Sequence, residues 1–131
     1  MNIRECIPED KHDIAAIDRA RLVGFPLLNQ ILPELLVWLR DSNWPVAVET
    51  ASLLSEANVE ITPHIKVVLD SEDGIWKYWT LKLVVSNLSF DVLGELRGEL
   101  VRLANYPTQN DRLEEVDIVA LEIVAAGFSA N

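Results

Sequence analysis

The sequence predicts an all-α fold, a short α-solenoid of about seven helices stacked as antiparallel pairs. Three observations predict it. Apolar residues recur at intervals of three and four, as on one face of a helix, and do not alternate as in a strand. Residues that cap helices precede several of these apolar stripes. Sliding the chain along itself by 30 residues aligns prolines and helix starts, which indicates an internal repeat.

The first two helices are predicted by a cap and by a long apolar stripe. Asp10 can cap a helix over about residues 11–22, and Gly24 can end it. The stripe that follows has the spacing i, i+3, i+4, i+7, i+8 and i+11, which places its members on one buried face. Pro33 lies within the stripe and removes one backbone donor, so a kink is expected there. The stripe consists of Leu28, Ile31, Leu32, Leu35, Leu36 and Leu39.

Two more helices are predicted in the middle of the chain. Asn43 can cap a helix over about 44–56. Thr62 followed by Pro63 is a favourable cap and first-turn pair for a short helix that ends near Leu69. The expected inward residues of the longer of these two helices are Ala47, Ala51 and Leu54.

Three further helices complete the prediction. Asp73 can cap a helix over about 74–86, and Ser89 can cap the next one. Asp111 with Glu114 resembles a capping box at the start of the last helix. The expected inward residues are Trp76, Trp79 and Leu83 in the first, Leu93, Leu96, Leu100 and Leu103 in the second, and Leu113, Val116, Ala120 and Ile123 in the third.

The repeat organises these helices into pairs. A shift of 30 residues places Pro33 on Pro63 and Asn43 on Asp73. Two helix pairs therefore repeat, a third pair follows at a looser spacing, and the first helix covers the N-terminal end. An irregular helical bundle is the alternative. The expected organisation is an N-terminal arm over 1–9, a repeat domain over 10–126 and a C-terminal tail over 127–131.

The repeat units carry residues typical of HEAT repeats. Pro33, Asp41 and Val46 stand where those repeats have a proline, an aspartate in the turn and a valine in the second helix. Pro63 and Lys77 fit the next unit. Over about residues 8–126 the chain resembles an uncharacterised bacterial single-domain family of HEAT-like α-helical repeats. The stretches that carry this resemblance are ILPELLVWL (31–39), NWPVA (43–47) and IWKYW (75–79). The resemblance implies a fold, and it implies no catalytic residue and no particular partner.

Charge and composition narrow the classes of partner. The chain has 21 acidic and 11 basic residues, and its net charge of −10 repels phosphate backbones and anionic membrane surfaces. Nucleic acid and membranes are therefore not expected as partners, whereas a basic protein is favoured. The apolar segments are shorter than the roughly 18 residues of a membrane span, and no signal-peptide pattern opens the chain. A cytoplasmic location is expected.

Few residue patterns point to catalysis. The sequence has no glycine-rich phosphate loop, no Gly-x-Ser-x-Gly elbow, no Cys-x-x-Cys pair and no His-Glu-x-x-His helix. His12, flanked by Asp10 and Asp13, could contribute to a metal site only if other helices supplied ligands. Acidic residues in the first turn of a helix are already explained by the helix dipole. The sequence therefore favours a non-enzymatic role and implies no cofactor.

The most informative feature is where unusual residues fall. If the second helices of the pairs run in the same direction, their N-termini emerge on one edge and bring aromatic and charged residues together. Trp38 and Trp79 are expected in the core, while core and binding surface both remain open for Trp44 and Trp76. The expected binding residues are Lys11, His12, Asp41, Asn43, Trp44, Glu72, Asp73, Trp76 and Lys77.

Two functions compete on this basis. The first is a protein-interaction module of immunity or adaptor type that binds its partner through the edge of helix N-termini. The second is a small-ligand or metal-dependent site in a groove. A deep pocket with converging charged groups would favour the second function, and a broad surface with an exposed Trp44 would favour the first. The residues of the second function are Lys11, His12, Asp13, Asp41 and Lys77.

Overall fold

The computed structural model describes residues 2–128. Over that range the protein is all-helical, with nine α-helices, five short 3-10 helices and no strand. The predicted all-α class is confirmed. The α-helices outnumber the seven expected because two of the expected helices are each divided by a short break.

The helices follow one another with short connections. The 3-10 helices are η1 (Ile3–Cys6), η2 (Leu27–Ile31), η3 (Val37–Leu39), η4 (Val59–Ile61) and η5 (Val85–Asn87). The α-helices are α1 (Ile14–Val23), α2 (Leu32–Leu36), α3 (Pro45–Leu54), α4 (Thr62–Leu69), α5 (Gly74–Leu83), α6 (Phe90–Glu95), α7 (Arg97–Asn105), α8 (Gln109–Leu113) and α9 (Val116–Gly127).

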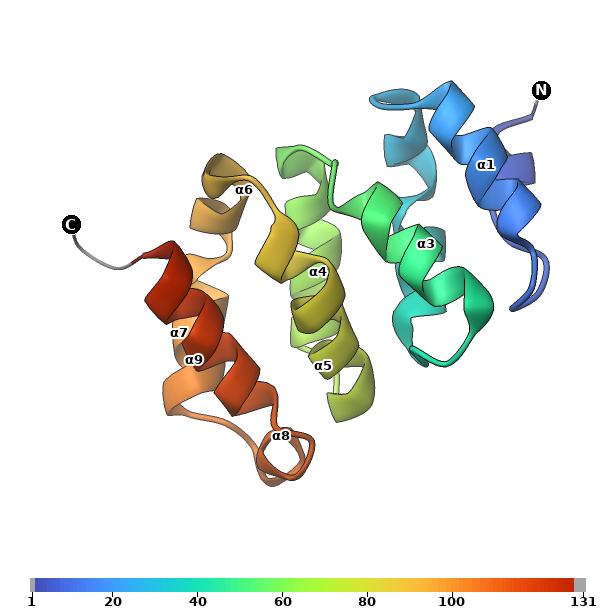
Figure 1. Ribbon diagram of the computed structural model, residues 1–131. Coiled ribbons are helices and arrows are strands. Elements are labelled where there is room, and N and C mark those ends of the chain that lie inside the picture. The colour runs from blue at the N-terminus through green and yellow to red at the C-terminus, as the bar shows by residue number, and fades with distance from the viewer. Residues whose placement is uncertain (1, 129–131) are drawn as a thin grey trace.

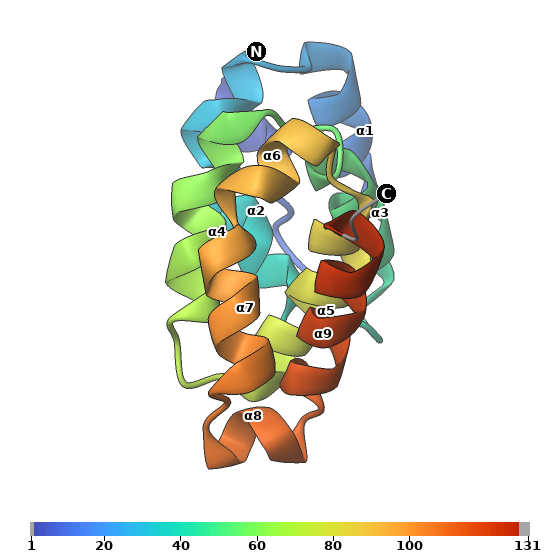
Figure 2. The same ribbon diagram turned by 90° about the vertical axis from the view of Figure 1, so that its left-hand side faces the viewer.

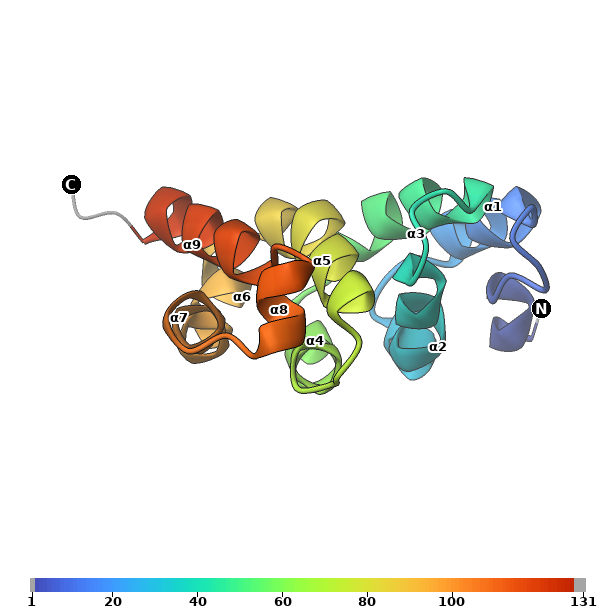
Figure 3. The same cartoon turned by 90° about the horizontal axis from the view of Figure 1, so that it is seen from below.

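The helices lie in two layers. Figure 3 shows α1, α3, α5 and α9 side by side in one layer and α2, α4 and α7 in the other. Within the first layer α1 contacts α3, α3 contacts α5, and α5 contacts α9. Across the layers α2 packs on α3, α4 on α5, and α7 on α9. Figure 2 shows α7 and α9 side by side along their length, with α8 below them and α6 above α7.

All four helices of the first layer begin on the same side of the molecule (Figure 1). We call this side the lower edge and define it by residues 9–13, 41–45, 72–76 and 114–117, which lead into α1, α3, α5 and α9. The starts of these four helices thus lie along one edge of the layer. The 3-10 helix η4 and α6 lie at the opposite edge.

The core follows the apolar stripes read from the sequence. Every member of the first long stripe is at most 1% exposed. The inward residues expected for α3 are buried, and so are the four leucines expected for the helix that is divided into α6 and α7. Two leucines expected in the core are exceptions: Leu83 is only half-buried, and Leu113 is exposed.

Pro33 divides its helix instead of only bending it. The segment before it is the 3-10 helix η2, which ends at Ile31, a residue with a φ of −123° and a ψ of 15° outside the helical region. Pro33 then lies in the first turn of α2, where a missing N–H leaves no hydrogen bond unmade. The six apolar residues of the stripe are buried on both sides of the break, so the break does not turn either segment away from the core.

Some expected caps are confirmed and others are wrong. Asp73 caps α5, since its carboxylate accepts a hydrogen bond from the Trp76 N–H at 3.0 Å. Asp10 does not cap α1; Asp13 does so, while Asp10 accepts from the His12 N–H in the preceding turn. Asn43 is not the cap of α3, because the residue at that position is Trp44 and Pro45 starts the helix.

The expected start of the last helix is also corrected. The capping box joins Thr108 and Asp111, not Asp111 and Glu114, and it starts the short helix α8. Glu115 then adopts a left-handed conformation with a φ of 61°, which separates α8 from α9. Leu113, expected inward, is 71% exposed because it ends α8 and does not lie within α9.

Two smaller expectations change in the structure. Thr62 is the first residue of α4 and not its cap, and its buried hydroxyl has no hydrogen-bond partner among the described residues. The described part of the expected N-terminal arm is folded, because η1 packs against α1 and η2 and buries Cys6. This burial raises the pKa of the Cys6 thiol. Within residues 2–128, no helix combines the length and apolar character that crossing a bilayer requires.

Candidate functional site

The lower edge has two halves, and the first is formed where α1 and α3 begin. The Val46 N–H donates to the Lys11 carbonyl oxygen at 3.1 Å, which joins the turn before α1 to the first turn of α3. Lys11, His12 and Asn43 are exposed there, and Asp41 is half-buried. Four of the expected binding residues are therefore brought together at this half of the edge.

Trp44 lies between core and surface. Its ring packs edge-on against Trp38 with 5.5 Å between the centroids, and both side chains are half-buried against the core. Trp38, expected in the core, thus reaches it only in part. An indole held on one side and open on the other is the usual environment of an aromatic anchor at a protein interface.

The second half of the edge is formed where α5 begins. Glu72 and Asp73 are exposed there. Trp76 is half-buried, and its Nε1–H donates to the Leu36 carbonyl oxygen at 2.9 Å. The guanidinium carbon of Arg40 lies 4.6 Å from the centroid of the Trp76 ring. Trp76 therefore ties α5 to the end of α2 and links the two halves of the lower edge.

Lys77 does not lie on the surface, which corrects its assignment as a binding residue. Its side chain is 4% exposed, and its Nζ lies 2.8 Å from Oδ1 of Asp111, which is fully buried. The other carboxylate oxygen of Asp111 accepts from the Thr108 N–H. Burial alone would raise the pKa of Asp111, but the hydrogen bonds from Lys77 and Thr108 and the charge of Lys77 hold that pKa below its usual value.

The buried face of α5 differs by one position from the expected one. Lys77, Thr80 and Leu81 face inward, whereas Trp76 and Trp79 are half-buried. The helix carries apolar side chains on all of its faces, so its sequence does not show which face is buried. The inward face packs against α3, α4 and α9, and α8 supplies Asp111 as a partner for the Lys77 ammonium.

The start of α5 approaches α8 closely. The Gly74 N–H donates to the side-chain oxygen of Asn110 at 2.9 Å. A Cβ at Gly74 would clash with the Asn110 amide and would lie 2.9 Å from Cγ of Glu114. A side chain at residue 74 would therefore force the Asn110 and Glu114 side chains to shift and would disturb the hydrogen bond between Gly74 and Asn110.

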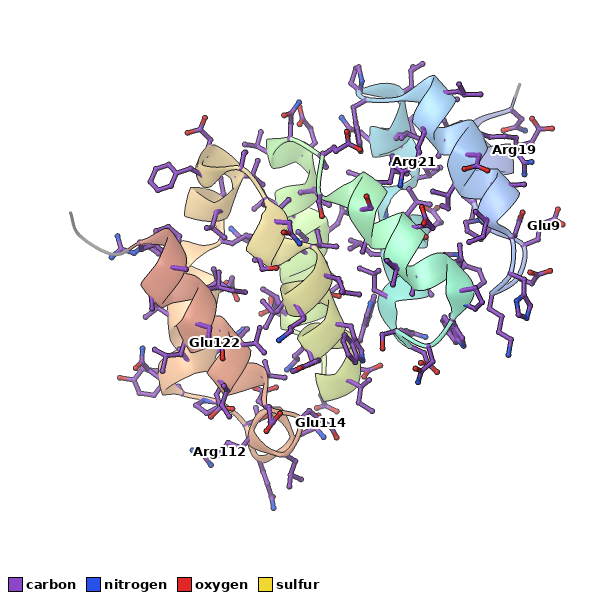
Figure 4. All side chains as sticks on the ribbon, viewed as in Figure 1. Glu9, Arg19, Arg21, Arg112, Glu114 and Glu122 are labelled. Atoms are coloured by element: carbon purple, nitrogen blue, oxygen red, sulfur yellow. The ribbon has the colours of Figure 1, made fainter. Side chains whose placement is uncertain are left out.

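Beside this contact lies a surface hollow that the sequence did not reveal. The α5–α8 hollow has a volume of about 230 Å³. Figure 4 places its Glu114 and the nearby Arg112 on opposite sides of α8. Two adjacent glutamates look like a solvated helix face in the sequence, and only the turn at Glu115 brings them next to the rings of α5. The lining residues are Ile75, Tyr78, Trp79, Leu113, Glu114 and Glu115.

The residues of the expected ligand or metal groove are engaged in local contacts. Asp13 accepts from the N–H groups of Ala16 and Glu9, and Asp41 accepts from the Asn43 N–H. Lys77 belongs to the buried pair with Asp111. Among residues 2–128, no group of three or more His, Cys, Asp or Glu side chains is placed to hold a metal ion.

Comparison with known families assigns the chain. The sequence model of DUF5071, described as a domain of unknown function, matches residues 6–124. The chain belongs to the DUF5071 family. This match confirms the expected membership in an uncharacterised domain family, and it includes the whole lower edge. The curated proteins contain no match to the chain.

The hydrogen bond from Trp76 to the Leu36 carbonyl is expected to contribute to the free energy of unfolding of this DUF5071 domain. Trp76→Phe keeps an aromatic ring but leaves the carbonyl oxygen of Leu36, a buried residue, without its donor. We expect the free energy of unfolding in urea to fall by about 1–2 kcal/mol. Trp79→Phe is the matched control, since the Trp79 indole donates no hydrogen bond within the described residues. An equal loss in both variants would show that ring size matters here and that the hydrogen bond does not.

Proposed function

We propose that this DUF5071 domain is a protein-interaction module with a HEAT-like α-solenoid architecture, and that its lower edge is the binding surface. The observation that carries the proposal is the convergence of four helix starts on one edge. Repeat folds commonly bind partners on surfaces that several units build together. Aromatic and charged residues meet there, as they do at the centres of protein interfaces. The exposed or half-buried members are Lys11, His12, Asp41, Asn43, Trp44, Glu72, Asp73 and Trp76.

The order of the helices supports the repeat architecture. In each of the pairs α2/α3 and α4/α5, the first helix has a proline in its first turn, Pro33 or Pro63, and the second helix runs back beside it. The pair α7/α9 continues the same two layers. This is the arrangement that the 30-residue correspondence between Pro33 and Pro63 in the sequence predicts.

Internal contacts make the lower edge rigid, which supports a binding role. The two halves are joined through Arg40 and Trp76, and α5 is joined to α8 through Gly74. A surface that is ordered before binding loses less conformational entropy when the partner docks. The edge can therefore contribute more of its contact energy to affinity.

The charge of the domain indicates the kind of partner. A net charge of −10 speeds encounter with a basic protein and disfavours acidic ones. We propose a cytoplasmic role of immunity or adaptor type, in which the domain covers a functional surface of a basic protein. The immunity role rests on analogy at the level of the fold.

A charge exchange tests the edge once a partner has been co-purified from the native cell and identified. Lys11→Glu combined with Glu72→Lys exchanges two exposed charges at the lower edge and leaves the net charge unchanged. We expect the dissociation constant, measured by calorimetry, to rise more than about tenfold. The melting temperature should stay unchanged, because neither side chain forms an ion pair among the described residues.

The matched control exchanges two charges away from that edge. Glu60→Lys combined with Lys66→Glu alters residues on η4 and α4 and again leaves the net charge unchanged. This control should bind the partner as the natural protein does. Loss of binding in the control and full binding in the lower-edge variant would show that the partner uses the opposite edge.

A further inference from the structure

The α5–α8 hollow combines two kinds of lining that suit a cationic side chain. Tyr78 and Trp79 lie at its wall, with 4.8 Å between their ring centroids in an edge-to-face arrangement. Glu114 and Glu115 lie at its rim. Ring faces and carboxylates both attract a positive charge, and the rings also accept the apolar stem of a long side chain.

The size of the hollow indicates one side chain and not a whole small molecule. Its volume of about 230 Å³ is below the roughly 300–1,000 Å³ of typical ligand pockets. Ile75 and Leu113, on either side of it, are exposed by 48% and 71%. These apolar side chains would be covered by the backbone of a partner that inserts a residue between them.

The two carboxylates are free to bind a partner. Neither Glu114 nor Glu115 forms an ion pair with a lysine, arginine or histidine among residues 2–128. Lys77 is engaged by Asp111, and Arg112 lies on the other side of α8 from Glu114. Lys82, further along α5, lines a separate hollow of about 380 Å³ with Glu122 of α9.

Arginine fits this lining better than lysine. A planar guanidinium stacks on an aromatic ring and donates two parallel hydrogen bonds to one carboxylate, whereas an ammonium is a compact and strongly hydrated charge. The chain already places its own Arg40 over Trp76 at 4.6 Å and its own Arg97 over Phe128 at 5.3 Å. The same contact with an external arginine requires a ring and a free carboxylate, and the hollow offers both.

We infer that the α5–α8 hollow binds an arginine side chain presented by a basic protein partner. The guanidinium stacks on the face of one of the two rings, Tyr78 or Trp79, which stand nearly perpendicular to each other, and it pairs with Glu114 or Glu115. The inference rests on the proposed function, and it names the residue by which the partner is recognised at this end of the lower edge.

Glu115 turns the chain at the edge of the hollow. Its φ of 61° lies in the left-handed region, which residues with a side chain seldom adopt. The turn places Glu115 together with Glu114 in the lining of the hollow.

A titration with a defined peptide tests the inference without the natural partner. The probe is a short peptide of alternating glycine and arginine, and its control has citrulline, which keeps the shape of arginine without the charge. Binding is followed by NMR through the indole N–H signal of Trp79, assigned with Trp79→Phe. We expect the arginine peptide to shift this signal with saturation, a lysine peptide to bind more weakly, and the citrulline peptide to leave it unchanged.

Two charge-matched variants locate the binding. Glu114→Gln with Glu115→Gln should weaken the arginine peptide about tenfold. Glu60→Gln with Glu95→Gln removes the same charge from exposed residues near the opposite edge and should change its affinity less than about twofold. Glu115→Gly should also weaken binding while keeping or raising the melting temperature, a combination that a purely structural role would not produce.

Three results would overturn the inference. They are the absence of any shift with the arginine peptide, equal weakening in the two glutamine pairs, and shifts that cluster at Trp44 instead of Trp79. Each of these leaves the proposed function standing if the charge exchange at Lys11 and Glu72 still weakens the identified partner. If the exchange at Lys11 and Glu72 does not weaken the partner, while the arginine peptide still binds in the hollow, the proposal that the whole lower edge is the binding surface is overturned and the inference about the hollow stands.

Discussion

Asp111→Ala is expected to lower the free energy of unfolding by about 3–5 kcal/mol, because it leaves the Lys77 ammonium buried without a partner. Lys77 is 4% exposed and Asp111 fully buried, so water cannot replace the lost carboxylate. The variant also removes the capping box of α8, because Asp111 is the residue that pairs with Thr108. Urea denaturation followed by circular dichroism measures the loss.

The partner variants separate the ion pair from the cap. Lys77→Met should cost less than Asp111→Ala, since the Asp111 carboxylate keeps the hydrogen bond that it accepts from the Thr108 N–H. The double variant should be more stable than the sum of the two single losses predicts, because it leaves no unpaired buried charge. Strict additivity of the two losses would mean that Lys77 and Asp111 do not act as a pair.

A surface ion pair provides the control. Arg21 reaches from α1 toward α3, and its Nη2 lies 3.3 Å from Oε2 of Glu49 (Figure 4). Both side chains are more than a third exposed, so Glu49→Ala should cost less than about 1 kcal/mol. A loss as large as that of Asp111→Ala would show that burial does not determine the effect.

The Asp111 carboxylate makes the free energy of unfolding depend on pH in the acidic range. The folded pKa of Asp111 lies below its unfolded value of about 3.9, so its contribution is fully present above that pH and is lost as the pH falls toward the folded pKa. The stability difference between the natural protein and Asp111→Asn should therefore shrink as the pH is lowered from about 7 to about 3. A difference that grows over this interval would contradict the lowered pKa.

Leu39→Ala should have the second large effect, a loss of about 2–5 kcal/mol in the free energy of unfolding. Leu39 is fully buried in η3 at the end of the first apolar stripe, so its truncation removes apolar contacts and leaves a cavity. The size of the loss depends on how far the surrounding helices can close around that cavity. Thermal and urea unfolding both report it.

An exposed leucine is the matched control for this truncation. Leu22, in the last turn of α1, is 85% exposed. Leu22→Ala deletes the same side-chain atoms as Leu39→Ala, but at a position exposed to solvent, and it should change the free energy of unfolding by less than about 0.5 kcal/mol. A loss below about 0.5 kcal/mol for Leu39→Ala as well would mean that the stripe does not form a tightly packed core.

The candidate site was predictable where local rules determine the structure. Asp73 caps α5 as its sequence predicts. Periodicity and caps are local properties, and they placed the apolar stripes and this helix start, although the caps of α1 and α3 are other residues than those expected. The site was not predictable where burial depends on a partner distant in the chain.

Lys77 and the α5–α8 hollow show that limit. Lys77 reads as a surface charge until Asp111, 34 residues away, is placed beside it. Trp79 reads as a core residue, but in the structure it is half-buried and lines the hollow between α5 and α8. No local signal in the sequence distinguishes these arrangements, because the desolvation of a charge is compensated only by a contact between helices.

The sequence by itself determined the all-α class, the apolar stripe from Leu28 to Leu39 and the cap at Asp73, and it located the irregularity at Pro33 as a kink, whereas the structure has a break there. Each of these depends on residues within a few turns of one another, where hydrophobic spacing and backbone donors decide the outcome. Only the tertiary structure decided which face of α5 is buried and how the chain turns at Glu115. Those choices depend on the fit of α5 against α8, in which Gly74 allows the close approach and Asp111 compensates the buried charge of Lys77.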